Sequence, residues 1–176
     1  MHAKLAISEI VEQLKTSFSD HVDEVVEFRG DTTVVVKAEG LIDVLTQLRH
    51  GDGMKFNLLS DLSAIDYYPN EPRFHVIYTL FSIAYNQGLR IKALTGDDNP
   101  HLPTVTSIWP SADYAEREVF DLFGVVFDGH PDPRRILMPH DWTGHPLRKD
   151  YPLGYEEVQF SFNYERVQSQ KPHPKE

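Results

Sequence analysis

Histidine and aspartate side chains that could bind a metal ion or transfer protons are concentrated in the C-terminal third of the chain. Imidazole nitrogens and carboxylate oxygens are common ligands of transition metals. The spacing of the three histidines matches no helix-borne pair such as HExxH. Histidines in His-Pro and Pro-His turns, with ring nitrogens bonded to backbone, explain the pattern as well. The sequence therefore leaves a small metal-dependent enzyme and a set of structural histidines both open. The residues concerned are His130, His140, His145, Asp128, Asp132 and Asp141.

No other arrangement of residues predicts an active site. Glu116 and Glu118 are poor candidates for a paired acid and base, because residues two apart on a helix diverge by about 200°. The sequence has no GxGxxG or GxxxxGK(S/T) loop for a nucleotide phosphate and no GxSxG nucleophile elbow. It has no cysteine, which excludes disulfides, thiolate zinc sites, cysteine nucleophiles and iron–sulfur clusters ligated by this chain. We therefore expect no complete active site in the chain.

Length and composition predict one acidic, soluble domain. The chain has 176 residues, of which 40% are hydrophobic, with 17 basic and 27 acidic residues and a formal net charge of −10. This length is typical of a single domain with its own core. The negative charge argues against a nucleic-acid-binding protein, which must neutralise phosphates. We find no signal peptide and no apolar run long enough to span a membrane. An intracellular location is therefore expected.

The first 95 residues show the alternation of helix and strand patterns that is typical of an α+β fold. Apolar residues recur at helical spacing in two segments, and β-branched and aromatic residues dominate five others. Successive strands joined by short turns pair in antiparallel fashion. We predict a mixed, mainly antiparallel sheet with helices packed on one face, followed by a long irregular C-terminal arm. The predicted helices span 4–18 and 41–48, and the predicted strands span 22–28, 32–37, 56–68, 73–85 and 89–95.

A third amphipathic helix is predicted over residues 111–123, with a serine that can cap its start and Gly124 as its C-terminal stop. One stripe of this helix is apolar and should face the core. The other side carries Phe120 and Arg117, and Arg117 lies four residues from each of two aspartates. This side could be a solvated face with weak ion pairs, a protein contact, or part of a catalytic site. The stripe comprises Ala112, Ala115, Val119, Leu122 and Phe123, and the aspartates are Asp113 and Asp121.

An irregular arm is predicted over residues 124–155, beginning with a short strand near 125–127. It is rich in proline and has no helical or strand periodicity, but its apolar and aromatic residues argue against disorder. Such an arm lies along its own domain or along a partner, and we favour the partner. The predicted organisation is an α+β domain over 1–123, the docking arm, and a C-terminal extension over 156–176 that is disordered near its end.

One part of the sequence resembles the signature of a known family. The pattern consists of Glu116-Arg117-Glu118, Asp121-Leu122-Phe123, His130, Arg134 and Ile136-Leu137. It resembles the signature of the C subunit, also called the 30-kDa subunit, of respiratory complex I. The segment GHPLRKDYP at 144–152 resembles the block that follows in the same family. The two blocks cover residues 116–152 directly, and the predicted elements before them are compatible with the family's domain.

The resemblance implies a non-catalytic subunit in the hydrophilic arm of a proton-translocating NADH:quinone oxidoreductase, on the cytoplasmic face of the bacterial inner membrane. It implies that FMN, iron–sulfur clusters, NADH and quinone are bound by partner subunits and not by this chain. It also implies docking onto the large quinone-site subunit, called D or 49-kDa, and onto cluster-bearing neighbours, with indirect membrane contact. The implied signature and interface residues are Glu116, Arg117, Glu118, Phe120, Asp121, His130, Arg134, Arg135, Trp142, His145, Arg148 and Lys149.

Some positions of the arm leave alternatives open. Pro133 stands where the family commonly has leucine, and residues 138–142 are similar to the ferredoxin-dependent photosynthetic relative of complex I. Residues 144–146 are instead similar to the mitochondrial form. A related domain occurs in membrane-bound hydrogenases. The equivalent subunit of either complex is therefore an alternative, and a metal-dependent enzyme that uses the arm histidines is an alternative from a different class.

Overall fold

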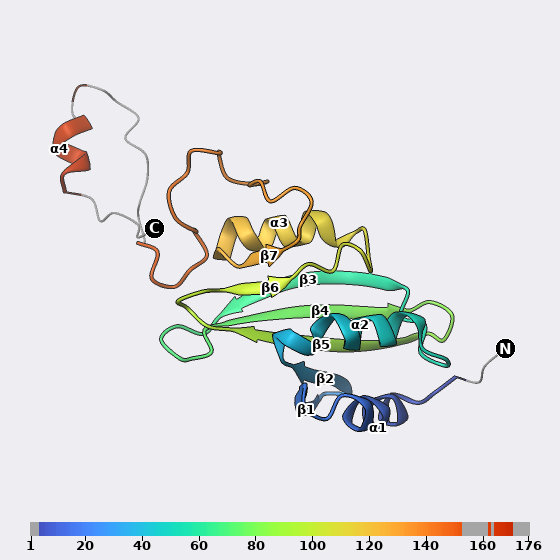
Figure 1. Ribbon diagram of the computed structural model, residues 1–176. Helices are drawn as coiled ribbons and strands as arrows, with labels where there is room; N and C mark the ends of the chain where they lie inside the picture. Colours follow the sequence, from blue (N-terminus) through green and yellow to red (C-terminus); the bar gives the residue numbers. More distant parts are fainter. Residues whose placement is uncertain (1–3, 153–161, 163, 171–176) are drawn as a thin grey trace.

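A five-stranded sheet forms the centre of the computed structural model, which describes residues 4–152, 162 and 164–170 (Figure 1). Its strands are β1 (Val22–Phe28), β2 (Asp31–Val36), β3 (Leu58–Asp66), β4 (Phe74–Ser82) and β5 (Gln87–Thr95). The strand order is β1-β2-β5-β4-β3. All neighbours are antiparallel except β2 and β5, which pair in parallel. The predicted mixed, mainly antiparallel sheet is therefore confirmed.

The turn between β1 and β2 shows how local sequence sets the register of a hairpin. Arg29 and Gly30 connect the strands with φ angles of 53° and 86°. Two successive positive φ angles are typical of a type I′ turn, whose twist matches the twist of paired strands. Glycine adopts such angles without steric cost, so the short polar loop closes the hairpin tightly.

Alternate strand residues point to the face that the helices cover. In β4 the residues Phe74, Val76, Tyr78 and Leu80 are fully buried, whereas the residues between them are only half-buried. This period of two is the pattern of a sheet with one packed face. Apolar residues that point the other way, such as Ile77, do not belong to the core cluster. The prediction that helices pack on one face is confirmed.

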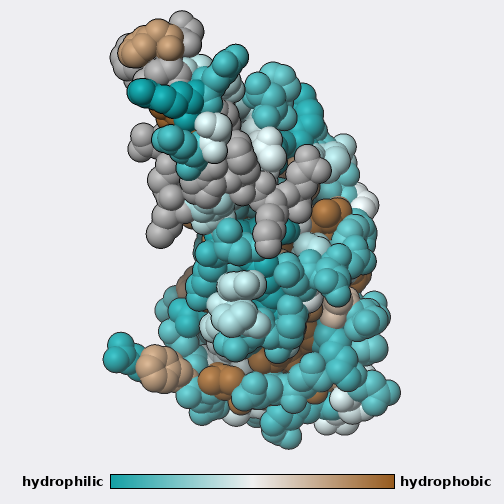
Figure 2. Space-filling view, turned by 90° about the vertical axis from the view of Figure 1, so that its left-hand side faces the viewer, coloured by the Kyte–Doolittle hydropathy of each residue, from teal (hydrophilic) through white to brown (hydrophobic). Residues whose placement is uncertain are grey.

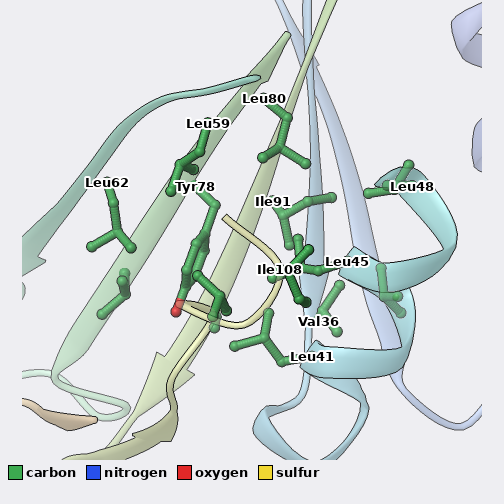
Figure 3. Packing of buried hydrophobic residues seen from close by; sticks show 14 of the residues in the cluster. Val36, Leu41, Leu45, Leu48, Leu59, Leu62, Tyr78, Leu80, Ile91 and Ile108 are labelled. Carbon is green, nitrogen blue, oxygen red and sulfur yellow. The ribbon is translucent and has the colours of Figure 1, made fainter. Parts of the chain in front are cut away.

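Two helices close the core over this face, α1 (Ile7–Ser17) and α2 (Leu41–His50). Leu41, Leu45 and Leu48 lie on one side of α2 and point toward strand residues such as Ile91 (Figure 3). Their spacing of three and four residues places them on one helical stripe. The leucine pattern alone therefore fixes which side of this helix is buried. A short 3-10 helix, η1 (Ala38–Gly40), leads into α2.

A third helix, α3 (Ala112–Phe123), packs along β3 and supports the arm (Figure 1). It begins one residue after the predicted start, and Gly124 ends it as predicted, with a φ of 77°. The predicted serine cap is wrong, because the Ser111 side chain makes no capping hydrogen bond. Two short parallel strands flank it in sequence, β6 (His101–Pro103) and β7 (Val126–Asp128). The sequence predicts β7 within one residue but does not predict β6, because three residues carry too little periodicity.

After β7 the chain forms only turns and bends up to residue 152, and this segment runs beside α3 (Figure 1). A short helix not predicted from sequence, α4 (Tyr164–Gln168), lies in the C-terminal extension. Disorder is predicted for the tail over residues 168–176, of which 171–176 lie outside the described residues. Residues 168–170 instead form the end of α4 and a turn. Within the described residues, no helix is long and apolar enough to cross a bilayer.

Removal of a core leucine should test the packing of α2. Leu45 is fully buried, so Leu45→Ala should lower the free energy of unfolding by about 2–5 kcal/mol through lost apolar contact and a residual cavity. Ile83 is 62% exposed, and Ile83→Ala should change the free energy of unfolding by about 0.5 kcal/mol or less. Urea unfolding of both variants measures the difference. Equal effects of the two substitutions would contradict the assignment of the core.

Candidate functional site

The charged side of α3 is buried beneath the arm. Glu116 and Asp121 are both fully buried, so the interpretation of this side as a solvated face is wrong. The possible pairs of Arg117 with the two aspartates of its own helix do not form, because Arg117 turns toward the arm. An irregular segment lacks partners for its own backbone groups, and those groups must be satisfied by other atoms. The polar side of α3 supplies these atoms.

Asp121 is the main acceptor for the arm. Its Oδ2 accepts hydrogen bonds from the backbone N–H groups of Ile136, Leu137 and Met138 at 3.0, 2.8 and 2.8 Å. Its Oδ1 accepts one from the Arg135 guanidinium at 2.7 Å. Burial by itself would raise the pKa of Asp121, but the three N–H groups and Arg135 stabilise the carboxylate and lower its pKa overall. The carboxylate therefore holds three successive residues of the arm in one conformation.

Arg117 completes this junction as a donor. Its Nε donates to the carbonyl of Arg134 at 3.0 Å and its Nη2 to the carbonyl of Arg135 at 3.3 Å. Its Nη1 also lies 3.7 Å from a carboxylate oxygen of Asp132. Side chains four residues apart on one helix, at 117 and 121, thus bind opposite groups of the same stretch of backbone. Their spacing places them on the same face of α3.

The arm also satisfies the carbonyl groups at the C-terminus of α3. The last carbonyls of a helix have no partner within it and favour positive charge nearby. The carbonyl of Asp121 accepts from His145 Nδ1 at 3.0 Å, and that of Leu122 from the Leu147 N–H at 3.0 Å. The carbonyl of Phe123 accepts from Arg148 Nε at 2.6 Å. The signature block at 144–152 therefore forms a cap for α3.

Gly124 permits this close approach. A Cβ at this position would overlap with Arg148 Nη2 and lie 2.5 Å from the His145 ring. Its positive φ also disfavours any side chain. The His145 ring lies edge-on to Phe120, with centroids 6.0 Å apart. Burial lowers the pKa of His145, so the imidazole is neutral and its Nδ1 carries the proton that it donates to the Asp121 carbonyl.

Glu116 and His130 join the start of the arm to the loop before α3. Glu116 accepts hydrogen bonds from the Val105 N–H at 2.7 Å and from the Thr104 hydroxyl. Burial raises its pKa, although these bonds favour the carboxylate. His130 Nδ1 accepts the N–H of Asp132 at 3.0 Å, so its Nε2 carries the proton and lies 3.1 Å from the Asp113 carbonyl. Both side chains thus bind backbone.

A second junction, centred on Arg73, was not predicted from the sequence. Arg73 directly precedes β4 and is 1% exposed. Its guanidinium binds Asp66 at the end of β3 at 2.8 and 2.9 Å, Asp97 at 2.8 Å, and Asp150 of the arm. The backbone N–H of Lys149 donates to Asp66 at 2.7 Å. Asp150 is 77 residues from Arg73, so no local pattern could reveal the contact.

Arg73 and Asp66 of this second junction each stabilise the ionised form of the other. Hydrogen bonding to Asp66 raises the pKa of Arg73. Burial alone would raise the pKa of Asp66, but Arg73 and the N–H groups of Lys149 and Tyr68 lower it overall. The Arg148 guanidinium lies 5.2 Å from the centroid of the Phe74 ring. The arm is therefore fixed at both ends by buried, paired charges.

The remaining predicted residues lie at the edge of these junctions. Glu118 is on the exposed side of α3, and Trp142 lies in a turn, where its backbone N–H donates to the Pro139 carbonyl at 3.0 Å. Arg134 pairs with Asp132 on the surface. Among the described residues, no group of three or more His, Asp or Glu is placed to hold a metal ion. The bonds of His130 and His145 favour the structural interpretation of the arm histidines.

The residues at these junctions lie within the part of the chain that a family model matches. A sequence model described as "Respiratory-chain NADH dehydrogenase, 30 Kd subunit" matches residues 34–157. The chain belongs to this family. Membership of the 30-kDa subunit family makes it a subunit of a hetero-oligomeric NADH–quinone oxidoreductase, the quinone-linked electron-transport complex known as complex I.

Relatives and solved structures agree with the 30-kDa subunit family. The NADH-quinone oxidoreductase C subunit of Roseiflexus sp. (strain RS-1) is 46% identical over 167 residues, covering 95% of this chain and 96% of the relative. The Geobacter metallireducens protein of the same name is 48% identical over 142 residues, covering 80% and 86%. A trypsin-resistant fragment (1–134) of Nqo5 is 31% identical with a TM-score of 0.61, covering 70% of this chain and 98% of the fragment.

The fold also occurs in another respiratory complex. A chain of the membrane-bound sulfane sulfur reductase, an archaeal respiratory membrane complex, matches with a TM-score of 0.64 and 23% identity, covering 96% of this chain and 95% of that one. At this identity the likeness concerns the fold alone.

Substitution of Asp121 should release the arm. Asp121→Asn removes the negative charge that binds Arg135 and three N–H groups, so it should lower the free energy of unfolding by roughly 3 kcal/mol. It should also speed tryptic cleavage after Arg134 and Arg135. Asp141→Asn, on an exposed residue of the same arm, is the control and should change stability by about 0.5 kcal/mol or less. An Asp121→Asn protein as protease-resistant as the wild type would show that this carboxylate does not hold the arm.

The raised pKa of Glu116 predicts a specific pH dependence. An unfolded glutamate titrates at about pH 4.3, and the folded chain holds the Glu116 proton more tightly. Tighter proton binding adds to the free energy of unfolding. This added stability is complete below about pH 4.3 and is lost as the pH rises through the pKa of Glu116 in the folded chain. The stability of the wild type minus that of Glu116→Gln should therefore fall as the pH rises above about 4.5.

Urea unfolding of both proteins at several pH values measures this difference. The lowered pKa values of Asp66 and Asp121 act in the opposite direction, but both proteins share them and they cancel. Glu118→Gln, two residues away on the exposed side of α3, is the matched control for the loss of one carboxylate from this helix. A flat profile for Glu116→Gln would contradict the burial of a titrating carboxyl at this position.

Proposed function

We propose that the chain is a non-catalytic structural subunit of the peripheral arm of complex I. In this proposal α3 and the arm dock onto the large quinone-site subunit, D or 49-kDa, and onto neighbouring cluster-bearing subunits. The chain thereby supports electron transfer from NADH to quinone, coupled to proton translocation, without taking part in the chemistry. Family membership supports the complex, and the geometry of the arm supports the docking role.

The observation that carries this proposal is the orientation of the arm. The backbone N–H groups of residues 136–138 are turned inward onto Asp121, and three of the arm's large apolar side chains remain exposed. Ile136, Leu137 and Leu147 are 37%, 59% and 51% exposed. Exposure of apolar side chains to water is unfavourable, and a fixed segment that presents them becomes more stable when another protein surface covers them. The ordered arm is therefore suited to a protein contact.

An adjacent hollow extends this surface toward the sheet. It has a volume of about 190 Å³ and lies between β3 and α3. Leu62, Val119, Leu122 and Leu147 contribute its apolar wall, and Glu118 lies at its edge. Stable complexes place apolar and aromatic residues at the centre of the contact and charges at the rim. The hollow and the exposed leucines together match this composition.

In this proposal the redox chemistry takes place in the partner subunits. The chain has no cysteine for iron–sulfur clusters, and its arm histidines His130 and His145 bind backbone groups. We propose that FMN, clusters, NADH and quinone are bound by other subunits. The names of the relatives support NADH as the electron donor over ferredoxin. We further propose a peripheral position on the cytoplasmic face of the bacterial membrane, with membrane contact through partners only.

Charge substitution of the exposed arm residues tests docking without disturbing the fold. The double variant Ile136→Asp, Leu137→Asp keeps the N–H groups that Asp121 binds but places two charges on the surface. Such variants should melt like the wild type yet lower recovery of the assembled complex at least about tenfold. Ile83→Asp, on an exposed isoleucine that follows β4, is the control and should assemble normally.

Recovery is measured with a tag on the chain at its native locus, mild detergent extraction and mass spectrometry of co-purifying subunits. The wild type should co-purify with cluster-bearing and membrane subunits and with an NADH-binding flavoprotein. Normal assembly of the double variant would refute docking through the arm. Co-purification without a flavoprotein would instead support the ferredoxin-dependent alternative.

A further inference from the structure

A groove between α3 and the first half of the arm differs in charge from the rest of the molecule. It has a volume of about 510 Å³ and is open to solvent. No carboxylate is among its lining residues, although the chain as a whole carries a net charge of −10. Figure 2 shows that the face it draws is largely hydrophilic, with apolar residues in small separate patches. The groove is lined by Arg117, Phe120, Pro133, Arg134, Arg135 and His140.

The guanidinium groups of the groove are only partly neutralised. Arg135 binds Asp121, and Arg117 and Arg134 share Asp132. Three guanidiniums therefore face two carboxylates, which leaves one positive charge in excess even with His140 neutral. Arg134 is the most exposed of them, with 79% of its side chain accessible. Its Nε and Nη2 bind Asp132, and an arginine has five N–H groups. Its Nη1 edge remains available to a second carboxylate.

The floor of the groove adds an apolar site. Arg117, Phe120 and Pro133 line both the groove and an adjoining small pit of about 30 Å³. Val126 and Phe127 add apolar wall to the pit, and Glu116 and His130 also line it. Phe120 is the aromatic residue that fits a solvated helix face poorly, and here it lines the groove together with three arginines. Arginine and aromatic residues side by side are typical of the centres of protein contacts.

We infer that this groove receives an acidic segment of a partner subunit, with a carboxylate bound to Arg134 and an apolar side chain placed against Phe120. The inference rests on the proposed docking function and adds the chemistry of the partner. Charge complementarity selects this occupant, because an acidic segment supplies the charge that the groove lacks. A planar guanidinium binds a carboxylate through two parallel hydrogen bonds, which also fixes the orientation of the segment.

The test measures binding of the purified full chain to detergent-solubilised complex from a strain that lacks this subunit. Arg134→Glu should weaken binding about tenfold or more, and Arg134→Gln should have a smaller effect. Asp132→Asn, which frees Arg134 from its internal partner, should strengthen binding. Arg90→Glu is the matched control, because Arg90 is also exposed and paired with an aspartate, Asp31, at 3.0 Å. It should bind like the wild type.

Salt dependence provides a second measurement. The affinity of the wild type for the complex should fall as the salt concentration rises from about 50 to about 300 mM, and the affinity of Arg134→Glu should fall less. Wild-type binding by Arg134→Glu would overturn the acidic-segment inference. The double variant Ile136→Asp, Leu137→Asp separates the two proposals. If this variant also binds normally, the proposal of docking through the arm is refuted as well. If the double variant loses binding while Arg134→Glu binds normally, only the acidic-segment inference is refuted.

Two other occupants would also overturn the inference. Binding of the wild type, but not of Arg134→Glu, to phosphatidylglycerol vesicles in the absence of protein would assign the groove to a lipid headgroup. Stronger binding to the complex after removal of residues 153–176, which include Glu156 and Glu157, would assign it to the chain's own acidic segment. Equal behaviour of both proteins toward vesicles, and unchanged affinity after truncation, is the expected result.

Discussion

The buried carboxylate of Asp121 is the interaction on which the functional surface depends. It accepts three consecutive backbone N–H groups and one guanidinium, and these bonds offset the cost of burying its charge. The arm forms no strand or helix of its own over residues 129–152, so its conformation must come from such contacts. Removal of this one charge would leave several polar groups of the arm unsatisfied at once. The arm is thus ordered by its contacts with α3.

Charges at the two ends of the arm give it a fixed course over the domain. Asp121 and Arg117 bind its first half, and the Arg73 cluster binds Asp150 and the backbone of Lys149 near its end. Between these points the arm caps the last carbonyl groups of α3. Such an arrangement uses the polar atoms of the arm for internal contacts and leaves apolar side chains outside. A docking surface can therefore be rigid without a sheet or a helix.

Sequence reasoning predicted the scaffold well and the polar network poorly, for a physical reason. Apolar periodicity reports directly on which side of an element is buried, as for Leu41, Leu45 and Leu48 of α2. Charges carry no such signal, because a charged residue is expected outside unless a partner is known. Helical spacing therefore leaves Asp121 and Glu116 on a face that could be solvated. Their partners lie 11 to 17 residues away in segments without periodicity.

The α+β class follows from the sequence alone, as do the β1–β2 hairpin, the family signature and the approximate extent of the three long helices, although α1 spans Ile7–Ser17 against a predicted 4–18. These features follow from local spacing and from residue types at fixed positions. Three features appear only in the folded molecule: the arm lies on its own domain, Arg73 joins β3, β4 and the arm, and arginines gather in one groove. Such contacts join residues far apart in sequence, and their free energy depends on burial that no local pattern encodes.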